Sequence, residues 1–378
     1  MEIQRIEPIV LESAVGTVSL PGGKADFDAT VTPVVARVET TDGIVGIGET
    51  YLDDPTGQKA LTVAQGIRAL EHELQGGDPR DVLSCWHEMY VHVKREGSYR
   101  AMSAIDEALW DIKGKAAGVP VYELLGGAAG ELSAYATFPH PKSDEQLIED
   151  AAWLTEHGFS TMKIAVGHGV ERDQERIEAV TAGLPNGMSL AIDANTTYDM
   201  ISAMKVGETA ASHDVAWFEE PIAHTNRQGQ ADLTHRLDVP ISAYQNHVTH
   251  YPAAEYVADD VLDIYQPALD FCGGITAAHR VATIIEPYDR QLVLHAFGPA
   301  INYAASLHVA AASPVSSLIE FGVYADDLDE PGRYIASPYV ANQEEISVNA
   351  DGTIAPPDRP GLGVELDEDA VAEYRINR

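Results

Sequence analysis

Three oxygen-bearing side chains recur at an even spacing in the middle of the chain. Asp193, Glu219 and Gln245 follow one another at intervals of 26 residues, and each closes a short apolar run, SLAID, VAWFE and ISAYQ. A strand with its covering helix and loops uses about that length, so each unit would deliver one such side chain from the same strand end. Two carboxylates and a carboxamide are hard oxygen donors, which suit Mg²⁺ better than Zn²⁺ or copper. The spacing predicts a Mg²⁺ site at the mouth of a parallel barrel, although single acidic residues also end strands for solubility or helix capping.

Short β-rich runs extend this spacing in both directions. They occupy residues 132–138, 161–166, 189–194, 215–220, 240–245, 263–268, 291–296 and 316–321. Helical patterns lie between them, as at 143–158, where apolar residues recur at helical spacing and Gly158 ends the run. Such alternation predicts an α/β fold in which eight parallel strands close into a (β/α)₈ TIM barrel.

The regions on either side of this pattern are different. Residues 1–129 begin as an antiparallel meander with a tight turn at Asp42-Gly43 and continue with helical segments, which predicts an α+β domain. The barrel domain is expected to span 130–325. Residues 326–378 are rich in Pro, Gly and Asp, which predicts an irregular segment that returns across the surface to the first domain.

Several longer motifs appear in a fixed order. They are SAIDEALWDIKGKAAGVPVYELLGG (103–127), MKIAVG, DAN with WFEEP, CGGIT and HAFGPAINYAASLHVAAASP. Together they resemble the mandelate racemase subgroup of the enolase superfamily over nearly the whole chain. The resemblance implies an α+β capping domain, a modified TIM barrel, one Mg²⁺ at the ends of the third to fifth strands, and abstraction of the proton α to a carboxylate. Many members are acid-sugar dehydratases; others are racemases, epimerases or cycloisomerases.

Two of the three predicted metal ligands match the family pattern. Asp193 and Glu219 do so, whereas Gln245 stands where most relatives carry Glu. An amide occupies this position in the glucarate dehydratase branch, and an amide carbonyl can bind Mg²⁺. Two carboxylates would just balance a divalent ion, so the ion should bind more weakly but remain a stronger Lewis acid. Asn246 is the ligand instead if the strand register slips by one, and a third possibility is that the metal has been lost.

The candidate bases are Lys163 and His295. Ala165 stands on the same strand face as Lys163, at the position of the second Lys of the family's Lys-x-Lys motif, so the usual lysine base is absent. Lys163 is left as a base, a polarising cation or a salt-bridge partner. His295 matches the family's catalytic histidine, but the Asp that orients it is replaced by Ala268, and Asp270 is only a possible substitute. Without a replacement, the basicity of the imidazole should fall.

This set of residues favours elimination. Racemisation needs a second base on the opposite face of the α-carbon, whereas His295 alone could abstract the proton and return it to a β-hydroxyl in a syn elimination. We therefore predict a Mg²⁺-dependent hydro-lyase that dehydrates a sugar acid, an aldonate or an aldarate, to a 2-keto-3-deoxy acid. One alternative is a racemase, epimerase or cycloisomerase that uses Lys163 and His295 from opposite faces. The other is a ligand-binding protein whose catalysis has lapsed, as the replacements at 165, 245 and 268 suggest.

Four residues are candidates for binding a small carboxylate substrate. Asn195 and Glu320 match family positions that hydrogen-bond the substrate carboxylate or the enediolate, although Glu320 could equally be a solvated strand-end carboxylate. Lys24 lies in a Gly-rich loop that closes over the barrel mouth in the family, and such a loop is also typical of an ordinary connection. His247, near a predicted strand end, is a candidate contact to polyol hydroxyls, or else an ordinary loop histidine.

The composition indicates the cellular environment in which the protein is expected to work. Among 378 residues, 59 are acidic and 24 basic, giving a net charge of -35 that is spread along the chain. Hydrated carboxylates at this density predict a halophilic cytoplasm and argue against binding nucleic acid or an anionic membrane. No signal peptide or membrane-spanning run is recognisable, and two cysteines define no disulfide framework, so we expect a cytoplasmic protein. Family members usually form dimers or octamers, which implies a homo-oligomer.

Overall fold

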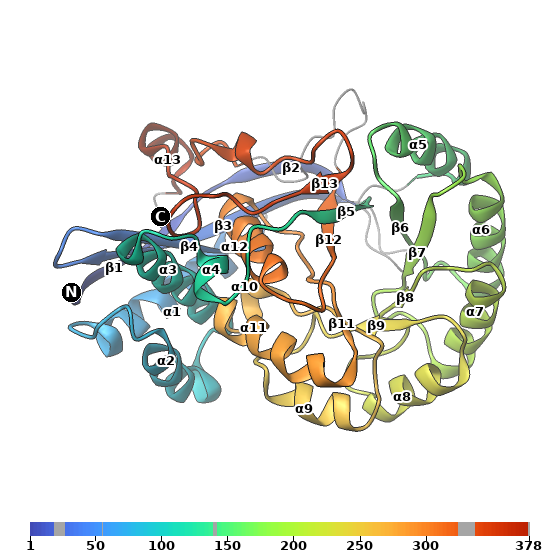
Figure 1. Ribbon diagram of the computed structural model, residues 1–378, viewed down its shortest axis with the longest axis horizontal. Coiled ribbons are helices and arrows are strands. Elements are labelled where there is room, and N and C mark those ends of the chain that lie inside the picture. Colours follow the sequence, from blue (N-terminus) through green and yellow to red (C-terminus); the bar gives the residue numbers. More distant parts are fainter. Residues whose placement is uncertain (19–26, 55, 139–141, 324–336, 377–378) are drawn as a thin grey trace.

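The computed structural model describes residues 1–18, 27–54, 56–138, 142–323 and 337–376. Figure 1 shows two packed parts, an antiparallel sheet with helices at one side and a ring of strands and helices at the other. The predicted α/β barrel with a preceding α+β domain is confirmed. Within the described residues, no helix combines the length and the apolar character that a membrane span requires.

The first part contains a four-stranded antiparallel sheet. Its strands are β1 (Ile3–Val10), β2 (Ser13–Val18), β3 (Phe27–Thr40) and β4 (Val45–Asp53), and β3 pairs with each of the other three. The predicted turn at Asp42-Gly43 joins β3 to β4. Gly43 has a φ of 84°, a conformation that glycine adopts without strain.

Helices follow this sheet along the chain. They are α1 (Gln58–Leu74), α2 (Val82–Glu96), α3 (Tyr99–Ala117) and the short α4 (Val121–Leu124). Of these, α1 and α3 pack on the strands of the sheet. The side chain of Ser98 caps the start of α3 by accepting from the backbone N–H of Ala101. The helix packs directly on β4, since a Cβ at Gly48 would lie 2.1 Å from the carbonyl oxygen of Ala104. The motif that begins at residue 103 is therefore mainly the buried helix that joins the two parts.

Eight parallel strands form the second part. They are β5 (Leu132–Thr137), β6 (Thr161–Ala165), β7 (Ser189–Asp193), β8 (Phe218–Glu219), β9 (Ile241–Ala243), β10 (Ile264–Tyr265), β11 (Gln291–Leu292) and β12 (Leu318–Gly322). Each lies inside or overlaps one of the predicted runs. The last strand, β12, pairs with the first, β5, so the order in the curled sheet is β11-β10-β9-β8-β7-β6-β5-β12. The N–H of Leu292 donates to the carbonyl of Val315, just ahead of β12, which links the two ends of this order.

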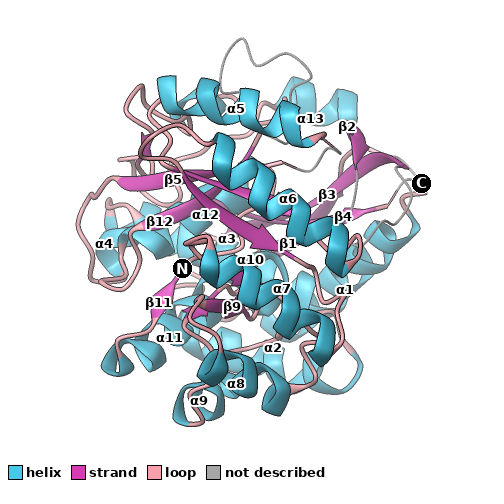
Figure 2. Cartoon of the chain, turned by 90° about the vertical axis from the view of Figure 1, so that its right-hand side faces the viewer, coloured by secondary structure: helices cyan, strands magenta, loops and turns pink. Residues whose placement is uncertain are grey.

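The barrel helices lie outside the strands, as Figure 2 shows for α5 to α8. They are α5 (Asp144–Glu156), α6 (Val170–Gly183), α7 (Met200–Ser212), α8 (Arg227–Arg236), α9 (Tyr251–Ala258), α10 (Leu269–Cys272), α11 (Gly274–Ile285) and α12 (Ala300–Ala311). Ser143 and Gln146 form a capping box at the start of α5. The helix then buries Leu147, Ala151 and Leu154 along one stripe, as the apolar spacing predicts.

The end of the chain returns to the first sheet. Two short elements belong to it, β13 (Thr353–Ile354), which pairs antiparallel with β5, and α13 (Glu368–Tyr374). The N–H of Ile376 donates to the carbonyl of Val10, and Arg37 on β3 forms an ion pair with Glu368. The boundaries 1–129, 130–325 and 326–378 remain predictions.

Buried carboxylates join the two parts. Glu49 on β4 accepts hydrogen bonds from the backbone N–H groups of Ile301 and Asn302, in the first turn of α12. Asp106 on α3 accepts from the backbone N–H of Thr276, in the first turn of α11. A carboxylate is stabilised at a helix N-terminus by the free N–H groups and the helix dipole. These contacts fix the first part against the two helices that follow β10 and β11.

Candidate functional site

The carboxyl ends of three neighbouring strands bring the predicted residues together. Lys163 lies on β6, Asp193 ends β7 and Glu219 ends β8. In the parallel register, Asp193 is opposite Glu219, so the two carboxylates end adjacent strands at the same level. Gln245 follows β9 in the connecting turn, where Tyr244 takes a φ of 106°. The even sequence spacing therefore corresponds to one edge of the barrel.

Lys163 is the buried cation at the centre of this site. Its Nζ lies 2.8 Å from Oε2 of Glu219 and 3.0 Å from Oε1 of Glu320. Asp193 Oδ2 is 3.7 Å away. Burial lowers the pKa of Lys163, but the surrounding carboxylates outweigh it and hold the pKa well above its usual value. Among the three alternatives for Lys163, this environment favours a fixed cation over a neutral base.

Glu219 has one saturated and one unused oxygen. Oε2 accepts from Lys163, from Nε2 of Gln266 at 2.8 Å and from Nε1 of Trp217 at 3.3 Å. Oε1 is buried and has no hydrogen-bond partner among the described residues. A buried carboxylate oxygen without a partner is costly unless something positive binds it. This orphaned atom fits a hard cation such as Mg²⁺.

Asp193 is the second acidic side chain that the sequence predicts as a metal ligand. Burial raises its pKa to about 8, the charge of Glu219 adds to this shift, and Lys163 opposes it. A second carboxylate at close range disfavours ionisation because like charges repel, and a divalent cation between the two would remove that penalty. The backbone N–H of Asn195 donates to Oδ1 of Asp193 at 2.8 Å. The other oxygen is left facing Lys163.

The third oxygen comes from an amide. Within the described residues, no three His, Cys, Asp or Glu side chains are grouped so that they could hold a metal ion by themselves. Gln245 is buried, and its Nε2 donates to Oε2 of Glu220 at 2.8 Å, which leaves the carbonyl oxygen as its remaining polar atom. Asn246 is exposed, and its Nδ2 donates to Oε1 of Glu220. Burial favours Gln245 over Asn246 as the third ligand.

His295 faces a carboxylate that the sequence analysis assigned to another role. Its Nδ1 lies 3.2 Å from Oε2 of Glu320 on β12. Burial lowers the pKa of His295, but the negative charge of Glu320 more than offsets this, and the net pKa is raised. The suggestion that Asp270 replaces the missing orienting carboxylate is wrong, because Asp270 forms an ion pair with Arg100 on α3. Glu320 is the carboxylate beside the imidazole, and the predicted fall in the basicity of His295 is not seen, because its pKa is raised.

Glu320 is fully enclosed and stays ionised. Its exposed fraction is 1%, which excludes the alternative of a solvated strand-end carboxylate. Burial raises its pKa, but the charges of Lys163 and His295 outweigh burial and lower the pKa to about 2. Oε2 also accepts from the backbone N–H of Ala296 at 3.1 Å. Glu320 therefore bridges the two predicted catalytic residues.

The other predicted substrate contacts have different surroundings. Asn195 lies at the barrel mouth, half-buried, with a φ of 43° that turns the chain directly after Asp193. His247 is packed in an aromatic cluster: its ring stacks on Tyr244 at 4.5 Å and its Nε2 lies 2.8 Å from the hydroxyl of Tyr256. Its pKa is lowered to about 4, chiefly by burial and then by His224. These contacts give His247 a structural role. Lys24 lies outside the described residues.

Four residues of the site were not identified as such from the sequence. They are Glu220, Gln266, Trp217 and Tyr135, whose ring centroid lies 5.6 Å from the Nζ of Lys163. The sequence does indicate one of them, Trp217, because it precedes Glu219 by two positions and so shares its strand face. Glu220 follows a strand end with a φ of 41°, so period-two alternation does not apply to it.

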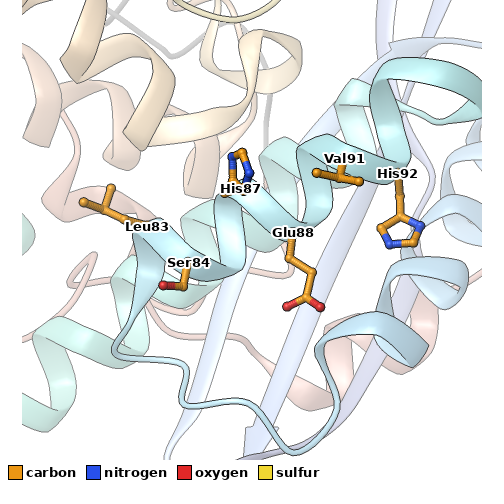
Figure 3. Close-up of a pocket in the computed structure, with 6 residues that line it drawn as sticks. All are labelled: Leu83, Ser84, His87, Glu88, Val91 and His92. Atoms are coloured by element: carbon orange, nitrogen blue, oxygen red, sulfur yellow. The ribbon is translucent and has the colours of Figure 1, made fainter.

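A pocket also lies away from this site, on the exposed face of α2 (Figure 3). Its volume is about 620 Å³, and it is lined by Leu83, Ser84, His87, Glu88, Val91 and His92. All of these belong to one helix of the first part. None of the carboxylates at the barrel mouth contributes to it, so this hollow is separate from the candidate active site.

Comparison with known proteins identifies relatives of this chain. The protein-family model for the N-terminal domain of mandelate racemase and muconate lactonizing enzyme matches residues 27–126, and the enolase C-terminal domain-like model matches 146–370. The chain is 32% identical to the D-galactarolactone cycloisomerase of Agrobacterium fabrum, over 91% of each chain. It is 31% identical to the D-galactonate dehydratase of Pectobacterium atrosepticum, over 90% of each. A solved racemase from Streptomyces coelicolor with bound magnesium superposes with a TM-score of 0.85 at 26% identity, covering 99% of this chain and all of that one.

Proposed function

Because the chain belongs to the mandelate racemase and muconate lactonizing enzyme family of the enolase superfamily, we propose that it is a Mg²⁺-dependent sugar-acid dehydratase. The substrate class is an aldonate or an aldarate, and the product is a 2-keto-3-deoxy acid. The observation that carries the proposal is a single paired base, His295 with Glu320, on a barrel whose other base position holds Ala165.

Asp193, Glu219 and Gln245 would hold the ion. Their oxygens are hard donors, and the orphaned Oε1 of Glu219 is the atom best prepared to receive a cation. When bound, Mg²⁺ supplies the positive charge that stabilises an enediolate next to the substrate carboxylate. The ammonium of Lys163, held by Glu219 and Glu320, adds a second positive charge at the same place.

His295 moves the proton. In its neutral form it takes the proton α to the carboxylate, and the electron pair of that C–H bond enters the enediolate. The resulting imidazolium is stabilised by Glu320 and then donates its proton to the β-hydroxyl, so the C–O bond breaks and water leaves. The enol that remains takes a proton at C3 and loses the proton of its C2 hydroxyl, which gives the 2-keto-3-deoxy acid. A single side chain thus serves as base and acid in a syn elimination.

A cycloisomerase is the second candidate, and the comparison with the Agrobacterium enzyme favours it. The same base could eliminate an oxygen that belongs to a ring of the substrate, so that the leaving group stays attached and an isomer results. Racemisation receives less support, because its second base would have to be Lys163, whose Nζ lies 2.8 Å from Glu219 and 3.0 Å from Glu320.

One experiment separates these functions. The purified protein is incubated in D₂O with Mg²⁺ and a panel of aldonates, aldarates and their lactones, and NMR follows product and isotope. We expect a 2-keto-3-deoxy acid from an open-chain acid. An isomer of a lactone without loss of water would support the cycloisomerase, and α-deuterium in recovered substrate with inverted configuration would support a racemase. Binding of substrates without any change in them would refute the proposed catalysis.

A further inference from the structure

Glu220 is a buried carboxylate beside the metal ligands that the proposed reaction does not use. Its exposed fraction is 1%, and it directly follows Glu219. Its φ of 41° lies in the left-handed region, which a non-glycine residue adopts at some cost in free energy. This conformation takes Glu220 out of the strand and places its side chain against the turn after β9. Both the burial and the strain call for a compensating role.

The carboxylate of Glu220 holds two amides at once. Nε2 of Gln245 donates to Oε2 at 2.8 Å, and Nδ2 of Asn246 donates to Oε1 at 2.8 Å. A carboxylate only accepts hydrogen bonds, so it can bind these amides only through their NH₂ groups. Without such a partner, an amide can turn over and present its NH₂ group to a cation, which repels it. The pairing therefore decides which end of Gln245 remains for the metal.

The same contact also supplies charge. Gln245 stands at the position where a third carboxylate would otherwise join Asp193 and Glu219, and the chain carries a carboxylate one hydrogen bond behind it instead. A negative charge that accepts from the NH₂ group polarises the amide and makes its carbonyl oxygen a stronger donor. Partners of this kind, one bond behind the ligand, both orient it and tune the metal.

We propose that Glu220 is a positioning residue, which turns the carbonyl of Gln245 toward the Mg²⁺ and replaces the negative charge that the amide ligand lacks. This inference rests on the metal site of the proposed function and goes beyond it, because it makes Glu220 necessary only while residue 245 is an amide. The consequence is a dependence between two positions that can be measured without substrate.

The test is a double-mutant cycle on metal affinity. Mg²⁺ binding is measured by isothermal titration calorimetry for the unchanged protein, Glu220→Gln, Gln245→Glu and the doubly substituted protein. We expect Glu220→Gln to weaken binding about 10- to 100-fold. In the Gln245→Glu background the same substitution should leave affinity unchanged or improve it, because an acidic ligand needs neither the orientation nor the extra charge and Glu220 then repels it.

Controls separate this role from simple loss of charge or fold. Glu178→Gln removes one exposed carboxylate from α6 and should leave the Mg²⁺ affinity unchanged. Thermal unfolding in the absence of metal shows whether each variant is folded. If Glu220→Gln alone unfolds, the doubly substituted protein still pairs a carboxylate with an amide at these two positions and can be measured in its place. Equal weakening in both backgrounds, or none in either, would overturn the inference. If the unchanged protein binds no Mg²⁺, the proposed metal site itself fails.

Discussion

Replacing His295 by Asn should remove catalysis and leave the metal site intact. Among the acidic residues of the site, the imidazole contacts Glu320. The proposed metal ligands Asp193, Glu219 and Gln245 have their own hydrogen-bond partners. Asparagine retains a polar side chain of similar size but cannot accept and release a proton near neutral pH. The substitution therefore tests proton transfer with little change in packing.

The size of the loss follows from the absence of a substitute. A positioned general base or acid contributes typically about 10²- to 10⁴-fold, which corresponds to about 2.7–5.4 kcal/mol of transition-state free energy. His295 performs both steps in the proposed mechanism. Ala165 provides no second base, and Lys163 is held as a cation, so the loss should lie at the upper end of this range.

The assay is single-turnover formation of 2-keto acid together with exchange of the α-proton in D₂O. We expect both rates to fall by about 10⁴-fold in His295→Asn, while Mg²⁺ affinity and thermal stability remain those of the unchanged protein. His247→Asn is the matched control, because this histidine packs between Tyr244 and Tyr256. It should lower the unfolding temperature and keep turnover. Retained α-proton exchange in His295→Asn would refute the reasoning and move the base to Lys163.

Three further predictions concern charge. Glu320→Gln removes the charge that raises the pKa of His295, so the rising acidic limb of the kcat/KM profile should move to lower pH, and an unmoved limb would contradict the pairing. Chelation of Mg²⁺ should lower stability by about 2.7 kcal/mol relative to the protein at a hundredfold excess over Kd, as calorimetry can measure. Burial raises the pKa of Asp106 from 3.8 to about 7, while hydrogen bonds from Thr276 oppose the shift. A raised carboxyl pKa favours the folded state at low pH, so this contribution should be lost as pH rises from about 4 through about 7. Asp106→Asn should flatten that part of the stability curve, and an unchanged slope would argue against it.

The strand positions are accessible from the sequence because each run is short, apolar and separated from the next by a helical pattern. What the pattern cannot give is where each strand ends. The run 215–220 becomes the two-residue strand Phe218–Glu219, since Glu220 leaves the extended conformation with a φ of 41°. Such ends depend on side chains that bind elsewhere, here on the amides of Gln245 and Asn246.

The positions of the proposed metal ligands can equally be predicted from the sequence, because residues that close consecutive parallel strands must meet at one edge of the sheet. Partners drawn from distant segments cannot. Asp270 pairs with Arg100, 170 residues earlier, and this contact exists only because α3 docks on the barrel. The pairing of His295 with Glu320 likewise depends on the strand order that places β11 and β12 at the two ends of the curled sheet. Neither contact can be predicted from the spacing of residues in the sequence.

The charges gathered at the barrel mouth give an independent reason for a divalent ion. The sequence analysis placed two carboxylates around Mg²⁺, and the structure places two more behind them, since Glu220 pairs with Gln245 and Glu320 with Lys163. Lys163 and protonated His295 are the cations in contact with this group among the described residues, so two negative charges remain.

The excess negative charge contributes to raised pKa values of two of these acids. The pKa of Asp193 is raised to about 8 and that of Glu220 to about 7, in each case by burial first and by the charge of Glu219 second. Without a cation, these two acids would therefore hold protons near neutral pH. One Mg²⁺ would offset this excess negative charge. Binding of the ion should then release protons from the protein, with the effect largest below the raised pKa values. Calorimetric titration in buffers of different ionisation enthalpy measures this release, and its absence at pH 6 would show that the carboxylates are not shared with a metal.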